Sequence, residues 1–148
     1  MKIPPYRFQA PLRFRRYQRD HVRGLLAEAL WELQSREAEI EQLQSEQGDA
    51  LEDLHRATQP GMLNVDAAVT RRIHLGQLKL RLNDAERRAK LAREQVELCR
   101  KTLVLADQKV KSLENIEEQD RQAYLWELER RESREREDNW LSLNAYER

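Results

Sequence analysis

The chain has 148 residues, of which 36% are charged and 39% are hydrophobic, with only 4 Gly and 4 Pro. It is too polar for an ordinary globular domain and too poor in Pro and Gly for a disordered linker, and this composition is typical of long helices and coiled coils. No stretch approaches the roughly 18 to 20 apolar residues of a membrane span, and a single cysteine excludes an internal disulfide framework. We therefore expect one elongated, soluble, cytosolic module.

The first predicted element is a basic N-terminal arm, residues 1–11, which three prolines keep out of a helix interior. Residues 1–24 carry seven basic residues and one acidic residue, with aromatic side chains among them. Such a patch can bind an acidic protein surface or nucleic acid, although basic patches are more often simply exposed to solvent. The candidate partner-binding residues here are Arg13, Arg15 and Arg16.

A first helix is expected over residues 12–58, because no proline occurs between Leu12 and Pro60. Apolar residues recur there in an alternating four-three spacing, which is the a/d seam of a heptad repeat. We name this row the first ladder. Its apolar members are Val22, Leu26, Ala29, Leu33, Ile40, Leu43, Ala50, Leu54 and Ala57, and its polar members are Arg36 and Gln47.

A turn is expected over residues 59–66, because Pro-Gly is a strong turn signal, and Asn64 or Asp66 can cap the following helix. The second helix is expected over residues 67–145. Its seam, the second ladder, has twelve uncharged positions in succession, and its many alanines allow two helices to approach closely. These positions are Leu75, Leu78, Leu82, Ala85, Ala89, Ala92, Val96, Cys99, Leu103, Ala106, Val110 and Leu113.

The charge distribution predicts that the two helices pair in opposite directions. Residues 25–59 carry nine acidic and two basic residues, whereas residues 60–113 carry twelve basic and six acidic residues. A chain that folds back near residue 61 places these blocks side by side, and opposite charges along a seam select that orientation. The expected fold is all-α, an antiparallel two-helix coiled-coil hairpin with an unpaired C-terminal helical overhang, residues 113–145.

Two exposed apolar sets are candidate docking surfaces. The first lies on the solvent side of the heptad near the turn, so it either binds another protein or marks a drift of the seam. It consists of Val69, Ile73, Gly76 and Leu80. The second lies in the overhang, where Trp126 and Trp140 are typical interface anchors. For the overhang we favour a foreign partner over self-association, which would bury the same residues.

Residues that carry chemistry are scattered. His21, His55 and His74 form no metal-ligand spacing, and Cys99 falls on the seam as a small apolar residue. Phosphate-binding glycine loops, nucleophile elbows and zinc-protease motifs are absent from the sequence. We therefore expect no enzyme activity, no cofactor and no metal.

Two segments of the chain carry a recognisable pattern. In residues 6–30, alternating aromatic and basic residues precede an LAEA-like segment; the residues of this pattern are Tyr6, Arg7, Phe8, Leu12, Arg13, Leu26, Ala27, Glu28 and Ala29. Residues 99–138 and the chain end carry the other pattern at Arg100, Leu103, Ala106, Lys109, Lys111, Leu113, Glu114, Ala145 and Arg148. The first segment resembles the N-terminus of the flagellar export protein FliJ family, and the second resembles that family's second-helix signature. Pro11 departs from the family pattern and predicts a delayed helix start.

The resemblance implies a coiled coil similar to the central shaft of rotary ATP synthases, acting without chemistry of its own in flagellar type III export. It implies three partners, which are the hexameric export ATPase, the export gate and export chaperones, and no nucleic acid. It also implies a cytoplasmic location, peripheral to the inner face of the cell membrane at the flagellar base. The end with both termini would enter the ATPase ring, and the region near the turn would meet the gate.

Two other functions remain open from the residues alone. A basic arm followed by heptads is similar to nucleic-acid-binding zippers, but Pro11 and the lack of a base-reading Asn disfavour this function. Binding that falls steeply with salt would favour it. The other function is a self-assembling scaffold coiled coil, which a concentration-independent monomer would disfavour.

Overall fold

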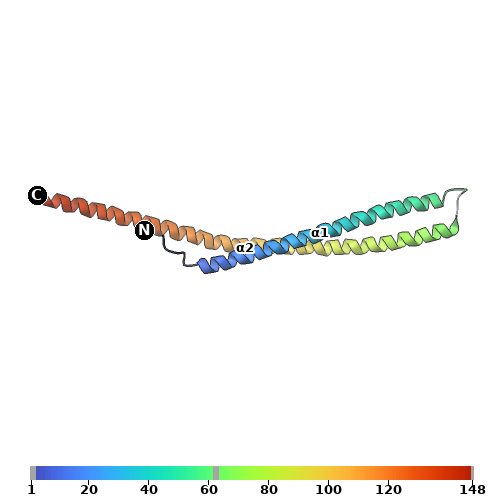
Figure 1. The fold of residues 1–148 in the computed structure, drawn as a ribbon, viewed down its shortest axis with the longest axis horizontal. Helices are drawn as coiled ribbons and strands as arrows, with labels where there is room; N and C mark the ends of the chain where they lie inside the picture. The colour runs from blue at the N-terminus through green and yellow to red at the C-terminus, as the bar shows by residue number, and fades with distance from the viewer. Residues whose placement is uncertain (1–2, 62–63, 148) are drawn as a thin grey trace. The chain divides into compact units, whose positions relative to one another are not determined.

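The computed structural model describes residues 3–61 and 64–147. It contains two helices, α1 over Gln9–Ala57 and α2 over Val65–Tyr146, and no strand among those residues. The helices run in opposite directions and pack against each other, so the expected all-α hairpin is confirmed (Figure 1). In the described ranges, neither helix has a stretch that is both long and apolar enough to cross a membrane.

The chain divides into two compact units. The hairpin unit comprises residues 22–103, and the terminal unit comprises residues 1–21 together with 104–148. Both helices contribute to both units. The turn lies in the hairpin unit, and the two chain ends lie in the terminal unit.

The hairpin unit is held together by the two predicted ladders. Every position of the first ladder is buried or half-buried, and so is every position of the second ladder up to Leu103. At its centre Ala29 packs with Val96 and Cys99. The heptad pattern therefore marks the buried face correctly, because residues three and four apart lie on one side of a helix.

Alanines form much of the buried surface that α2 contributes to this unit. Ala85, Ala89 and Ala92 are all buried, and Ala89 is 0% exposed. Leu26 and Leu33 of α1 are half-buried and pack against the cluster of Ala29, Val96 and Cys99. Alanine also has the highest intrinsic helix propensity.

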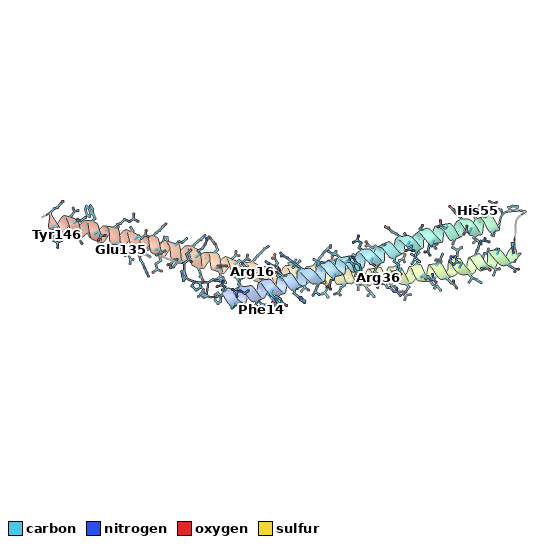
Figure 2. The ribbon with its side chains drawn as sticks, viewed as in Figure 1. Phe14, Arg16, Arg36, His55, Glu135 and Tyr146 are labelled. Carbon is cyan, nitrogen blue, oxygen red and sulfur yellow. The ribbon has the colours of Figure 1, made fainter. Side chains whose placement is uncertain are left out.

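Arg36 is the charged member of the first ladder, and its own helix supplies its partners. The Nε group donates to Glu32 Oε1 at 2.9 Å, and Nη1 donates to Glu39 Oε2 at 3.4 Å (Figure 2). The aliphatic part of a long arginine can cover apolar surface while its guanidinium stays at the edge. A charge is thus tolerated in the seam without an unpaired buried group.

The turn between the helices has a glycine where the backbone requires one. Gly61 has a φ of 88°, in the left-handed region that residues with a Cβ rarely adopt. Asn64 caps α2, since its side-chain Oδ1 accepts the Ala67 N–H at 3.3 Å. Of the two expected caps it is therefore Asn64 that acts. Met62 and Leu63 of the expected turn lie outside the described residues.

The helix α1 begins three residues earlier than residue 12, where it was expected. Pro11 does not delay the start, because it lies in the first turn, where a missing N–H breaks no helical hydrogen bond. The Leu12 N–H already donates to the Phe8 carbonyl oxygen at 2.9 Å. The other helix ends differ from expectation by one or two residues.

In the terminal unit, the non-helical residues 3–8 continue the pairing beyond the start of α1. Tyr6 Oη donates to the Leu113 carbonyl oxygen at 2.8 Å, and Arg7 Nε lies 3.3 Å from Asp120 Oδ2. These contacts of the arm reach α2 as far as Asp120, which lies past residue 113, where the unpaired overhang was expected to begin. Extended chain covers about 3.3 Å per residue against about 1.5 Å for helix, so six residues can span a dozen helical ones.

Candidate partner-binding surfaces

Residues 3–8 lie against α2, and we name them the docked arm. Tyr6 anchors the docked arm, and its phenol lies near the carboxylates of Glu117 and Asp120 on α2. Partial desolvation and then the charges of Asp120 and Glu117 raise the pKa of this phenol above its ordinary value of 10.0, against the opposing charge of Arg7. A raised pKa means that the folded chain holds the proton more tightly than the unfolded chain does. The protonated phenol is also the form that donates to Leu113.

We expect the docked arm to be lost in alkaline solution. The stability that Tyr6 contributes is fully present below the pKa of the unfolded chain, and it disappears as the pH rises through the higher folded pKa. Nuclear magnetic resonance of ring-labelled tyrosine, assigned with Tyr6→Phe, would give both pKa values in native and denaturing solution. Asp120→Asn should reduce the difference between them. Equal pKa values in both states would contradict the docked phenol.

The three candidate arginines near the start of α1 do not form one cluster. Arg13 is exposed, whereas Arg15 is half-buried and donates from Nη1 to Gln18 Oε1 at 3.0 Å. Arg16 Nη2 donates to Glu114 Oε1 on α2 at 3.1 Å (Figure 2). An exposed ion pair of this kind contributes only about 0 to 1 kcal/mol. Arg16 therefore has an intramolecular role that spacing along the sequence did not reveal.

Two exposed aromatic residues of the same helix were not among the predicted site residues. Phe14 and Tyr17 both point away from the seam and are largely exposed. Arg15 lies with its guanidinium carbon 5.9 Å from the centroid of the Phe14 ring. Their heptad positions, outside the first ladder, are the signal that could have identified them.

The four candidate residues near the turn are all exposed on α2. Leu80 is 71% exposed, Ile73 is 59% exposed and Val69 is 50% exposed, and a side chain at Gly76 would meet open space. The seam does not drift toward them, so they form a separate surface of the hairpin unit. The seam in this stretch consists of Leu75, Leu78 and Leu82.

The hairpin unit has further exposed apolar residues that the sequence reasoning missed. Leu91 and Leu98 are exposed on α2 and lie one heptad apart. On α1, Trp31 is exposed and lines a shallow groove of about 620 Å³ together with Leu25 and Gln95. All of these residues lie outside the two ladders. The heptad pattern that identifies the buried positions therefore also predicts that these side chains are exposed.

Beyond the docked arm, α2 continues as an exposed helix over residues 125–146, which we name the terminal segment. Both predicted anchors lie on it in the open, and the Arg130 guanidinium sits 4.7 Å from the centroid of the Trp126 ring. An i,i+4 pair joins Arg131 to Glu127 at 3.1 Å. Pairs at this spacing stabilise a helix that has no partner. Trp126 and Trp140 are thus presented on helical backbone.

The terminal segment follows a short stretch of α2 with close ion pairs. Arg121 Nη2 donates to Glu118 Oε1 at 2.7 Å, and this hydrogen bond lowers the pKa of the Glu118 carboxyl.

Across the described residues, no group of His, Cys, Asp and Glu is arranged to hold a metal ion. Cys99 is a free thiol buried in the seam of the hairpin unit.

A hairpin of two long helices, with apolar and aromatic residues exposed on both of them, defines a coiled-coil protein. The model of the family described as the flagellar FliJ protein matches residues 5–142. The chain therefore belongs to the FliJ family, and the resemblance seen in the sequence is confirmed. It is a component of the flagellar export apparatus, in a family of non-catalytic proteins. Comparison with curated proteins and with solved structures gave no match.

Proposed function

We propose that this protein is a stalk that couples the hexameric export ATPase to the export gate and also binds export chaperones. The observation that carries the proposal is the continuity of α2 from Val65 to Tyr146. One uninterrupted helix bears the exposed residues near the turn and the exposed tryptophans of the terminal segment. Mechanical coupling needs such an element between two binding surfaces. In this proposal, the protein is located at the cytoplasmic face of the cell membrane at the flagellar base.

The terminal unit is the part that we assign to the ATPase ring. Its terminal segment alternates acidic and basic side chains and carries two exposed tryptophans. Such a surface suits a polar lumen with aromatic pockets, and Trp is a frequent anchor at interfaces. The exposed set at Val69, Ile73 and Leu80 is the part that we assign to the gate.

The first test is ATP hydrolysis by the cognate export ATPase with and without this protein. We expect the protein to raise the hydrolysis rate and to promote ring formation in sedimentation. The double variant Trp126→Ala, Trp140→Ala should lose this effect, because two anchors are removed. Trp31→Ala is the matched control, as it removes an equally exposed tryptophan from the hairpin unit. An unchanged rate with a folded protein would overturn the assignment.

The gate contact predicts a second effect. The double variant Ile73→Glu, Leu80→Glu should weaken binding to the gate protein by about tenfold or more, because two charges replace an apolar contact. Calorimetry or surface plasmon resonance measures this. Leu91→Glu, Leu98→Glu is the matched control, with two exposed leucines of the same unit. Loss of helicity in circular dichroism, or an equal loss of binding in the control, would contradict the proposal.

A further inference from the structure

Six residues of the terminal segment lie on one face of α2 with a symmetric spacing. We name this row the terminal face; its members are Leu125, Leu128, Glu132, Arg136, Trp140 and Leu143. Successive members are three, four, four, four and three residues apart, and this pattern reads the same from either end. The last member lies 18 positions after the first, which is five turns at 3.6 residues per turn. All six therefore fall within an arc of about 120° on a straight helix.

The chemistry of the terminal face complements its own reverse. A second terminal face in the opposite direction brings Leu125 against Leu143, and Leu128 against Trp140. In the two inner layers, the Glu132 carboxylate of each copy faces the Arg136 guanidinium of the other copy. Apolar layers thus meet apolar layers, and opposite charges meet at the centre. An interface in which one patch faces a copy of itself is the isologous contact of a two-fold dimer.

A parallel pairing of the same face has no such match. In register, it brings Glu132 against Glu132 and Arg136 against Arg136, and like charges at facing positions repel. Arg134 lies on the opposite side of the helix and is away from the interface in either orientation. The inner charges therefore select one orientation.

The inner charges are available for such a contact. Within the chain, the Glu132 carboxylate forms no ion pair among the residues that the structure describes. Arg136 donates from Nε to the Glu132 backbone carbonyl at 3.3 Å, which leaves its two Nη groups to reach outward. Of the outer layers, Leu125, Trp140 and Leu143 are exposed and Leu128 is half-buried. The segment extends into solvent around Glu135 and Tyr146 (Figure 2).

We infer that the terminal face binds a second copy of this chain in antiparallel orientation and forms a two-fold dimer. This inference concerns the free protein and does not rest on the proposed function. In the free protein a second copy occupies this face, because the pattern of charges is complementary to itself; since Trp140 is also assigned to the ATPase, the dimer must dissociate before that contact forms. A two-helix contact of five turns is smaller than a standard interface of about 1,600 Å², so we expect a weak dimer that forms at high protein concentration.

Sedimentation equilibrium of the full chain, from low micromolar to several hundred micromolar, tests the dimer. The decisive variants exchange the inner charges. Glu132→Arg alone and Arg136→Glu alone each place like charges in both inner contacts, and each should weaken the dimer by about tenfold. The double variant Glu132→Arg, Arg136→Glu restores opposite charges and should return the dissociation constant to within about threefold of the original.

The controls separate this face from other surfaces. Arg134→Glu changes a charge on the opposite side of the helix and should leave the dimer unchanged. Cysteine substitutions report the direction: Leu125→Cys mixed with Leu143→Cys should cross-link, whereas each variant alone should not. Helicity measured by circular dichroism should stay constant through the series.

A chain that stays monomeric at several hundred micromolar would overturn the inference. A double exchange that fails to restore dimerisation while helicity is kept would also overturn it, because a foreign or unrelated surface would not respond to the swap. Stimulation of the ATPase is a separate measurement. A monomer that stimulates hydrolysis contradicts the dimer alone, and a dimer that does not stimulate contradicts the proposed stalk alone.

Discussion

Leu78→Ala is expected to lower the free energy of unfolding by about 2 to 3 kcal/mol. Leu78 is 1% exposed and is among the largest fully buried side chains of the molecule's described part. Its truncation removes apolar contacts and leaves a cavity that two helices cannot close without losing neighbouring contacts. We place the value in the lower part of the usual range, because a two-helix seam surrounds a residue less completely than a globular core does.

Urea unfolding followed by circular dichroism measures this loss. Leu80→Ala is the matched control: it lies two residues further along the same helix, and the residue is 71% exposed. Both substitutions change helix propensity equally, so their difference isolates burial in the seam. The control should change the free energy of unfolding by no more than about 0.5 kcal/mol. Equal losses would show that the seam does not pass through Leu78.

Ala89→Asp is expected to lower the free energy of unfolding by about 3 kcal/mol or more. Ala89 is 0% exposed, and the short aspartate side chain cannot reach solvent from the seam as a longer one can. The variant therefore buries a charge without a partner, or separates the helices to hydrate it. Ala38→Asp, at an exposed position of α1, is the control and should show only the lower helix propensity of aspartate, about 0.6 kcal/mol.

The pH dependence of this loss gives a second readout. Burial raises the pKa of the introduced carboxyl in the folded chain above its value of about 3.9 in the unfolded chain. The folded state then binds the proton more tightly, so part of the loss is relieved at acidic pH and returns as the pH rises through the folded pKa. Unfolding of both variants between acidic and neutral pH measures it. A loss that is the same at every pH would contradict burial of the carboxyl.

The seam is the part of the fold that periodicity predicts best. All twelve positions of the second ladder are buried or half-buried, from Leu75 to Leu113. A heptad repeat is a local signal, since it depends only on which residues share one side of a helix. The same signal identified the exposed set near the turn, because residues off the ladder face solvent. Leu91 and Leu98 follow the same rule, because they lie off the second ladder and are exposed.

The candidate site was less predictable where it depends on contacts between distant parts of the chain. Arg13, Arg15 and Arg16 are adjacent in sequence, yet they differ in exposure and in partners. Helical geometry points neighbouring residues in different directions, and Arg16 meets Glu114 only because α1 and α2 pair in one register. Composition could show that this region is basic, but not which of its arginines form ion pairs within the chain.

The sequence by itself determined the two-helix fold, its orientation and the buried row on each helix, because those follow from a local repeat and from blocks of opposite charge. Only the tertiary structure decided where the pairing ends. Tyr6 and Arg7 reach Leu113 and Asp120 because extended chain covers more length per residue than helix does. That contact depends on the path of the arm across α2, and no repeat along the chain encodes such a path.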